Sequence, residues 1–462
     1  MVKKHLHEHL HKFETTIWLL VKITLYLILL AIFILIMGRQ NVGLTRPSRM
    51  LGITVTTFLA VEFLFSMVYG TYDVGRRKSK PIIYTMVVAI LCTDLITYVQ
   101  VMIMRTNNPS VRPFRLMSLG LLALSFLVQI VVIILFVYAG NAVFFMIHEP
   151  EKCCVITSGQ ESLDRIAFAV GRYKKQYRIV RVLSFRDRKV CEKLDGIDTV
   201  FIYDVPSTMR TEIMRYCYRH RINVYFNPDV EDIMELSSEA YMMEDIYLVN
   251  KNVKALTMQQ RIAKRLMDIV LSVVLLVISS PLLLIAAIAI KLDDGGPVFF
   301  MQDRATIHGR RFKMYKLRTM HVNNEERSAT EDDSRITKPG AFLRRTRIDE
   351  LPQLLNILKG DMTFVGPRPE MIKNVEDYEK QLPEFRYRLR VKAGLTGYAQ
   401  IHGKYNTSPR DKLAMDMLYI ETFSILHDIQ IILQTVIVLF RSDSTEGFSK
   451  TTEHCEFEFP KV

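Results

Sequence analysis

Long apolar runs separated by short polar loops dominate the first third of the chain. Four such runs cover residues 17–37, 50–69, 82–104 and 116–145. Each is close to or above the ~20 residues that an α-helix needs to cross a hydrocarbon core. The pattern predicts an α-helical, four-helix transmembrane domain over residues 1–148. Basic residues in the N-terminus and in the loop "YDVGRRKSKP" favour a cytoplasmic location for both ends of this domain.

Two carboxylates, Glu62 and Asp94, interrupt these apolar runs. A charge in a hydrocarbon environment is costly, so such residues often mark a functional site. Packing between helices explains them equally well, and no site is assigned to them from the sequence.

The pattern changes after residue 150 to short β-rich runs that alternate with helical ones. Four runs are typical of buried strands, with helical stretches between the first two and between the last two: "CCVITSG", "YRIVRVLSF", "DTVFIYDVP" and "INVYFNP". This order predicts an α/β Rossmann-like domain over residues 149–250. The first strand ends in "SGQES", which lacks the G-x-G-x-x-G fingerprint of dinucleotide binding. A structural or regulatory module is therefore expected.

A fifth apolar run, "MDIVLSVVLLVISSPLLLIAAIAIKL", follows a basic linker, and the two together occupy residues 251–292. Ser280 and Pro281 lie at its centre, where proline removes a backbone donor and should kink the helix. Basic residues flank both ends, which favours a helix that enters and leaves the same face of the membrane. We expect a re-entrant membrane helix, and a kinked spanning helix is the alternative.

Charge changes this picture of a membrane protein. The net charge is +13 and the pI is near 9.3, although 49% of the residues are hydrophobic. The combination indicates membrane segments joined to basic parts, and nucleic acid, anionic lipids or a phosphorylated substrate would each account for the charge. From the whole sequence, anionic lipids and a phosphorylated substrate are expected as partners, and no nucleic acid. The six cysteines are scattered without a CxxC pair or zinc spacing, which indicates reduced thiols on the cytoplasmic side.

Adjacent carboxylates, Asp349 and Glu350, stand among arginines in "RRTRIDELPQLLNILKG". Leucines at helical spacing follow them, and Gly360 is placed as a C-terminal stop. We expect Asp349 or Thr346 to cap the helix, where its dipole and the arginines favour ionised carboxylates. An ionised aspartate can act as a nucleophile without a general base, and Glu350 is placed to bind a divalent cation. Simple capping is the structural alternative.

Three further clusters surround this pair in the sequence. "GGPVFFMQDRATIHGRRFKMYKLRTM" offers Lys316 and Arg318 as candidate substrate-binding cations. In "GDMTFVGPRPEM", Pro367 and Pro369 hold Arg368 on a stiff backbone, from which its planar fork can meet a phosphate or a base edge. The backbone amides of "RVKAGLTGYAQIHGK" can approach an anion.

The chain from about residue 261 onward resembles the bacterial sugar transferase family, the polyprenyl-phosphate hexose-1-phosphate transferases. Five segments carry the resemblance in order: "KRLMDIVLSVVLLVISSPLLL", "GPVFFMQDR", "YKLRTM", "RRTRIDELPQLLNILKGDMTFVGPRPE" and "KAGLTGYAQIHGK". The preceding membrane helices and Rossmann-like module are similar to the long form of that family, whose members initiate capsule, exopolysaccharide or O-antigen repeat units. The resemblance implies a mixed α/β cytoplasmic phosphoglycosyl transferase domain over residues 293–462.

The resemblance also implies roles for single residues. Asp349 falls on the family's nucleophile and Glu350 on its Mg²⁺ ligand. Arg344 falls on a phosphate contact. The Pro-Arg-Pro motif (367–369) falls on a uridine-nucleotide contact, and the Ser280–Pro281 pair on the membrane-turning position. The chain departs from the family at Lys404, where arginine is usual, so the role of that position is left open.

The implied reaction transfers a hexose-1-phosphate from a UDP-sugar to polyprenyl (undecaprenyl) phosphate. It passes through a covalent aspartyl-phosphosugar intermediate and releases UMP. The implied location is the bacterial inner membrane, with several passes and a cytoplasmic catalytic domain. Homo-oligomerisation and the identity of the hexose stay open.

Two rival functions account for part of the pattern. A non-catalytic membrane scaffold or sensor that binds anionic lipids would explain the basic charge but not the Asp-Glu pair. A metal-dependent glycosyltransferase would use Asp293 and Asp294 of "LDDGG", although such acids more often form a helix-ending turn. The apolar run "FSILHDIQIILQTVIVLF" is interrupted by polar residues and predicts an interfacial or packed helix.

Overall fold

The computed structural model describes residues 2–69, 74–75, 77–106, 117–251, 256–321, 335–403, 407–439 and 457–460. The chain forms two compact units. The first contains Met1–Cys153 and Ala169–Val180, and the second contains Cys154–Phe168 and Arg181–Val462.

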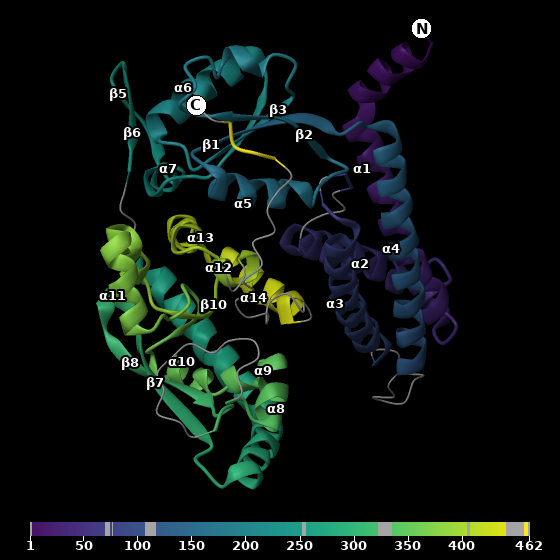
Figure 1. Ribbon diagram of the computed structural model, residues 1–462. Helices are drawn as coiled ribbons and strands as arrows, with labels where there is room; N and C mark the ends of the chain where they lie inside the picture. The colour runs from purple at the N-terminus through teal and green to yellow at the C-terminus, as the bar shows by residue number, and fades with distance from the viewer. Residues whose placement is uncertain are drawn as a thin grey trace. The chain divides into compact units, whose positions relative to one another are not determined.

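Four apolar helices make up most of the first unit (Figure 1). They are α1 (Val2–Met37), α2 (Arg49–Tyr69), α3 (Ser79–Thr106) and α4 (Leu119–Ile147), with a 3-10 turn at Val42–Leu44. These helices cover the first three predicted runs in full and the fourth from Leu119 onward. Together with α8 of the second unit, they are long and apolar enough to cross a membrane.

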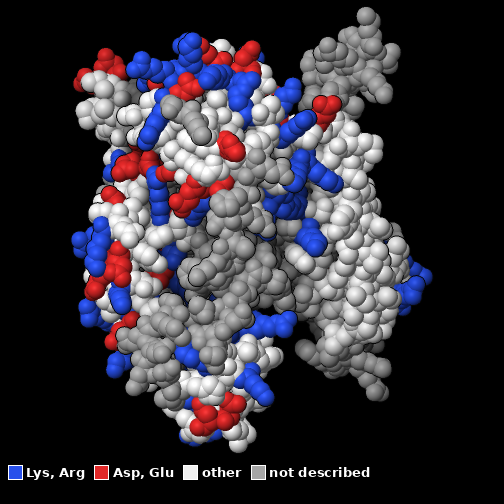
Figure 2. All heavy atoms as spheres, viewed as in Figure 1, with Lys and Arg blue, Asp and Glu red and all other residues white. Residues whose placement is uncertain are grey.

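The outer face of α4 shows why this unit suits a lipid environment. Leu127, Val131 and Leu135 recur every four residues and are each more than half exposed, at 59%, 56% and 62%. Figure 2 shows that the surface over this helix carries few charged side chains. The inner faces pack around fully buried residues such as Leu29, Phe33 and Phe58.

A four-stranded sheet follows, in the order β2-β1-β3-β4. Its elements are β1 (Glu151–Thr157), α5 (Gln160–Gly171), β2 (Tyr177–Ser184), a 3-10 turn (Glu192–Leu194), β3 (Thr199–Tyr203), α6 (Ser207–His220) and β4 (Asn223–Phe226). All four predicted strands and both predicted helices are confirmed. Strands β3 and β4 pair in parallel, as a βαβ connection requires.

A short helix and a hairpin that the sequence did not predict follow this sheet. They are α7 (Val230–Glu235) and the antiparallel strands β5 (Glu239–Met243) and β6 (Ile246–Asn250). Every residue of the two strands is exposed. The predicted linker is also shorter than expected, because helix α8 (Met258–Asp294) already begins within it.

Helix α8 continues without a break through Pro281. Proline cannot donate to the carbonyl four residues earlier, Val277 O, but the hydroxyl of Ser280 donates to this oxygen at 2.8 Å. Ser279 donates in the same way to Leu275 O at 2.6 Å. The two serines therefore satisfy backbone groups at the centre of an otherwise apolar helix.

The rest of the second unit is a mixed α/β domain built around α8. Its elements are β7 (Phe299–Ala305), a turn (Ile307–Gly309), β8 (Arg311–Leu317), α9 (Lys338–Arg345), a turn (Ile348–Glu350), α10 (Gln353–Lys359), β9 (Thr363–Val365), α11 (Ile372–Gln381), a 3-10 segment (Pro383–Arg390), β10 (Gly394–Thr396), α12 (Tyr398–His402), α13 (Pro409–Glu421) and α14 (Ile425–Leu439). Strands β7 and β8 form an antiparallel hairpin, and β9 and β10 pair in parallel.

Buried ion pairs and hydrogen bonds fasten the N-terminal half of α8 to this domain. Lys264 donates to Val365 O at 3.0 Å and to Asp428 of α14. Asp268 accepts from the hydroxyl of Thr363 at 2.8 Å and from the N–H of Phe364 at 2.9 Å. Helix α14 is thus the packed helix that its interrupted apolar pattern predicted.

Candidate active site

The two adjacent carboxylates lie in a tight turn ahead of helix α10. After α9, Arg347 adopts a left-handed backbone conformation with a φ of 59°. The 3-10 turn Ile348–Glu350 follows, and α10 begins only at Gln353. Its N-cap is Pro352, which has no side chain that can accept a hydrogen bond.

The prediction that Asp349 or Thr346 caps α10 is therefore wrong. The reversal at Arg347 and the proline separate both residues from the first helical turn, and Thr346 is instead the C-cap of α9. The predicted stop is confirmed, because Gly360 has a φ of 87° and its N–H bonds to two carbonyls of the last turn.

Asp349 is buried, and only 8% of its surface is exposed. Burial, followed by the neighbouring charge of Glu350, raises its pKa to about 6, while Lys316, Arg347 and Arg344 act in the opposite direction. The sequence predicted a shift that favours the ionised form, so the direction of the prediction is wrong. A pKa near 6 still leaves most of this carboxylate ionised at neutral pH.

Glu350 has the opposite electrostatic balance. Burial alone would raise its pKa, but Arg368, Lys316 and Arg347 hold it well below its usual range. Its Oε1 lies 2.8 Å from Arg368 Nη2, 3.2 Å from Lys316 Nζ and 3.8 Å from Arg347 Nη1. Two neighbouring carboxylates therefore differ in charge state near pH 6, because one is desolvated and the other is paired.

These contacts bring together most of the residues that the sequence selected. Lys316 comes from β8, Arg344 from α9, and Arg368 from the loop after β9. Pro369 accepts a hydrogen bond from Arg304 Nη1 at 3.3 Å on its carbonyl, and Pro367 accepts one from Gly394 N at 2.9 Å. Hydrogen bonds to the carbonyls of both prolines thus hold the Pro-Arg-Pro segment on either side of the arginine.

A buried network of ion pairs and hydrogen bonds, which the sequence did not reveal, holds the backbone of Arg368. Arg388 Nη2 donates to the carbonyl of Arg368 at 2.9 Å, and the same guanidinium pairs with Asp416 at 2.7 Å. Arg388 and Asp416 are 2% and 1% exposed. Glu370 joins this network through Arg388 Nη1, at 3.7 Å, and it also pairs with Lys412 at 2.9 Å.

The glycine-rich segment "KAGLTG" has a structural role that differs from the predicted one. Gly394 N donates to Pro367 O, and Gly366 N donates to Thr396 O at 2.9 Å, so these amides serve the pairing of two chain segments. A Cβ on Gly394 would lie 2.1 Å from Gly366 N, which only glycine avoids. Lys404, at the end of the longer segment "RVKAGLTGYAQIHGK", lies outside the described residues.

Several buried polar atoms of the predicted site have no hydrogen-bond partner among the described residues. They are Asp349 Oδ1, Arg344 Nη1, and Arg318 Nε and Nη1. Each buried polar group left unpaired costs about 1–3 kcal/mol. Guanidinium N–H groups in this state suit an anionic ligand, and Asp349 Oδ1 keeps its lone pairs available.

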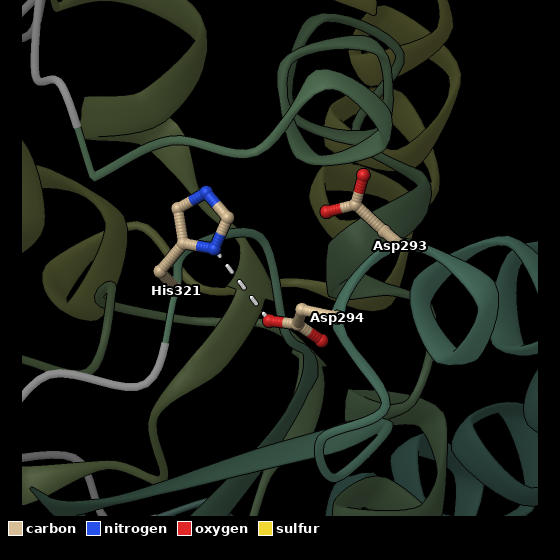
Figure 3. Close-up of side chains that lie close together, drawn as sticks. All are labelled: Asp293, Asp294 and His321. Carbon is tan, nitrogen blue, oxygen red and sulfur yellow. Dashed lines mark ion pairs between the residues drawn. The ribbon is translucent and has the colours of Figure 1, made fainter.

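Arg318 contacts the C-terminal end of α8, where two aspartates and a histidine lie close together. Its Nη2 pairs with Asp294, and His321 Nδ1 lies 3.6 Å from the same carboxylate (Figure 3). The arginine holds the pKa of Asp294 below its usual range. Ligand atoms of Asp293, Asp294 and His321 lie within 4.8 Å of one another, and all three residues are exposed.

This cluster is also a helix end, as the acids of "LDDGG" predicted. Gly295 closes α8 in a left-handed conformation with its N–H on Lys291 O. Gly296 leaves room for the Arg318 guanidinium, because a Cβ there would lie 2.3 Å from Nη1. Asp294 thus orients Arg318, which the sequence offered as a candidate substrate-binding cation.

Comparison with known proteins assigns this domain. The family model described as "bacterial sugar transferase" matches residues 259–442. A UDP-glucose:undecaprenyl-phosphate glucose-1-phosphate transferase of Caulobacter vibrioides is 41% identical over 189 residues, which is 39% of this chain and 71% of that protein. The chain belongs to the bacterial sugar transferase family.

Two further relatives show how far the similarity within this sugar transferase family extends. A UDP-N-acetylgalactosamine-undecaprenyl-phosphate N-acetylgalactosaminephosphotransferase of Aeromonas hydrophila is 40% identical over 37% of this chain and 42% of its own length. An undecaprenyl-phosphate glucose phosphotransferase of Komagataeibacter xylinus is 32% identical over 63% of this chain and 61% of its own length. The match to these two relatives spans less than two-thirds of their lengths.

Proposed function

We propose that the protein is a phosphoglycosyl transferase that moves a hexose-1-phosphate from a UDP-sugar to polyprenyl phosphate. The products would be UMP and a polyprenyl-diphosphate sugar, the first intermediate of a surface polysaccharide repeat unit. The observation that carries the proposal is the buried, unpartnered Oδ1 of Asp349 beside Lys316, Arg344 and Arg347, in a chain of the sugar transferase family.

Two displacements at phosphorus would make up the reaction. In the first, Asp349 Oδ1 attacks the β-phosphorus of the UDP-sugar, the bond from that phosphorus to the bridging oxygen breaks, and UMP leaves with the electron pair. In the second, an oxygen of polyprenyl phosphate attacks the aspartyl-bound phosphorus and releases the carboxylate. Both nucleophiles are anions, so neither step requires a general base.

The cations that the sequence selected would offset the charge of the transferring group. Arg344, near the dyad, and Arg318, at the end of α8, have buried N–H groups without a partner among the described residues, and they would donate to phosphate oxygens. Arg368 would meet the uridine nucleotide from the backbone that Arg388 holds. Such donors act most strongly where water is excluded.

The carboxylates fit Mg²⁺ in a specific way. Three cationic side chains already approach Glu350 Oε1, and their charge opposes a further cation. A metal ion would therefore be held there together with the anionic diphosphate of the substrate, which offsets that charge. Bound Mg²⁺ would supply charge neutralisation at the diphosphate. Glu350 is the residue that would hold it.

Helix α8 would bring this site to the cytoplasmic face of the bacterial inner membrane, and helices α1–α4 would anchor the chain there by crossing the bilayer. Asp268 and Asp294, near opposite ends of α8, both contact the same domain. Apolar side chains beside the Ser280–Pro281 pair are exposed, with Val277 at 68% and Ile285 at 64%. Both observations support a helix that dips into one leaflet with its elbow at this pair and returns.

The test is the nucleotide product formed by membranes or purified protein with a panel of UDP-sugars and polyprenyl phosphate. The names of the relatives make UDP-glucose and UDP-N-acetylgalactosamine the first donors to try. UMP is expected, its release should stop in Asp349→Asn and after EDTA treatment, and it should continue in the control Asp377→Asn, an exposed residue of α11. Release of UDP would contradict the proposal, and activity that survives EDTA would remove the metal.

A further inference from the structure

A polar cluster lies inside the apolar helices of the first unit. Glu62 of α2 and Asp94 of α3 are 2% and 1% exposed, so neither carboxylate reaches the surface. These are the two acids that the sequence left without a role, and the proposed transferase reaction does not use them.

Hydrogen bonds link these acids to α3 and α4, and through Gln129 to α1. Gln129 of α4 donates through Nε2 to Asp94 Oδ1 at 3.2 Å and to the carbonyl of Leu29 in α1 at 3.1 Å. The hydroxyl of Thr93 lies 2.8 Å from Glu62 Oε2. The cluster is therefore a shared interior feature of the helices.

Several oxygen atoms of this cluster have no partner. Asp94 Oδ2, Thr97 Oγ1, Ser125 Oγ and Gln129 Oε1 are buried and lack a hydrogen bond within the described part of the chain. The residues that carry them are all at most 1% exposed. Left in this state, each group has lost its hydrogen bonds to water without gaining a replacement, which destabilises the fold.

The geometry of α3 and α4 places these atoms on facing turns. The helices are antiparallel, since Asn141 bonds to Ser79 at one end and Tyr98 to Met117 O at the other. Thr97 lies three residues after Asp94, and Ser125 lies four residues before Gln129, so each pair shares a helix face. Because Asp94 and Gln129 are bonded, Thr97 and Ser125 face each other one turn further along.

The chemistry of the set selects the ligand. The unpartnered atoms belong to one carboxylate, one carboxamide and two hydroxyls, which are the hard oxygen donors that bind alkali and alkaline-earth cations. The nearby carboxylate of Glu62 adds negative potential, so an anion is disfavoured. A single carboxylate with three neutral oxygens suits a monovalent ion better than a divalent one.

We propose that α3 and α4 hold a small monovalent cation, with Na⁺ as the probe, between Asp94, Thr97, Ser125 and Gln129. Binding would supply the missing partner to each of the four oxygens at once. The ion would then act as a stabilising link between these two helices, independently of the transferase site.

The experiment uses the full chain in nanodiscs, without substrate. Thermal unfolding is followed while NaCl replaces N-methyl-glucamine chloride at constant ionic strength, and binding of radioactive Na⁺ is counted. A saturable rise in Tm and about one bound ion per chain are expected, because a ligand of the folded state stabilises it by mass action. Asp94→Asn and the smaller change Ser125→Ala should both abolish the response.

Ser66→Ala is the matched control. Ser66 is also a buried serine of these helices, but its hydroxyl already donates to Phe63 O at 2.8 Å, so its loss should leave the Na⁺ response intact. A Tm that ignores Na⁺ and follows only pH would show a proton in place of the cation and overturn the proposal. An equal Na⁺ response in the wild type and Ser125→Ala would overturn it as well.

Discussion

Asp349 and Glu350 are neighbours in the chain, yet their surroundings give them different properties. Asp349 has an oxygen without a hydrogen bond among the described residues, and its pKa is raised because it is buried beside another carboxylate. Glu350 has its charge fixed by Arg368 and Lys316. The proposed division of labour between a nucleophile and a metal-holding residue rests on this difference.

The acid limb of the pH–rate profile should report the state of Asp349. Protonation removes the attacking lone pair, so kcat/KM should fall below a pH of about 6, well above the range of an ordinary aspartate. Removing a nearby cation raises the pKa further, and Arg347→Met should therefore move the limb to higher pH. Steady-state rates of UMP release across pH measure this.

Arg345→Met is the control for this prediction, because Arg345 is an exposed residue of α9 and is not among the charges that shift Asp349. A limb that stays near pH 4 in the wild type, or that moves equally in both variants, would be inconsistent with Asp349 as the titrating group.

At the scale of elements, the segment that carries Arg368 depends on a buried pair contributed by distant parts of the chain. Arg388 lies in the 3-10 segment after α11, and Asp416 lies in α13. Neither touches the dyad, but Arg388 holds the carbonyl of Arg368. We regard both as positioning residues.

Loss of one member of this pair should be more harmful than loss of both. Arg388→Met leaves Asp416 buried without its counter-charge, which costs about 3–5 kcal/mol, whereas replacing both partners with apolar residues is often close to neutral. The Tm of Arg388→Met should fall and that of Arg388→Met/Asp416→Leu should largely recover.

Activity separates positioning from stability in the same variants. The double variant still lacks the donor to the Arg368 carbonyl, so KM for the UDP-sugar should stay raised after the Tm has recovered. Full recovery of KM together with Tm would mean that the pair contributes only to folding.

The direction in which α8 leaves the membrane is also testable. Single cysteines at Asp245, in the exposed hairpin turn before the helix, and at Lys313, an exposed residue of β8 after it, report on the two sides. An impermeant maleimide should label both in inverted vesicles and neither in right-side-out ones, with the unmodified chain as background. Labelling of the two sites from opposite sides would establish a spanning helix.

Local patterns were sufficient for some elements and not for others. The strands β1–β4, the stop at Gly360 and the packed helix α14 follow from periodicity, glycine chemistry and polar interruptions within a few residues. The start of α10 could not be predicted, because it depends on the left-handed Arg347. The Arg388–Asp416 pair joins residues 28 apart and leaves no local signal.

The pKa of Asp349 was predicted less well than the set of charged residues that lie near it. Arginines near Asp349 indicated a lowered pKa, but burial and Glu350 outweigh them. Burial depends on how β8, α9 and the loop after β9 close around the dyad, which spacing in the sequence does not reveal. The glycines of "KAGLTG" were misread for a similar reason, since their close approach to Gly366 is a tertiary contact.

At the scale of the whole molecule, a chain of the sugar transferase family combines a mixed α/β C-terminal region with apolar helices and a four-stranded sheet. The family model matches residues 259–442, so family membership rests on the C-terminal part of the chain. The proposed reaction joins a water-soluble donor to a lipid acceptor and would take place at a membrane surface. The long apolar helices suit that location.

The central claim is that Asp349 becomes covalently attached to the sugar phosphate, and trapping that species tests it. Purified protein is mixed with the active UDP-sugar in the absence of polyprenyl phosphate, quenched, digested and examined by mass spectrometry. We predict a hexose-phosphate adduct on the peptide that contains Asp349, about one equivalent of UMP, discharge of the adduct by polyprenyl phosphate, and no adduct in Asp349→Asn. Release of UMP only when polyprenyl phosphate is present, with no adduct at any time, would contradict the account.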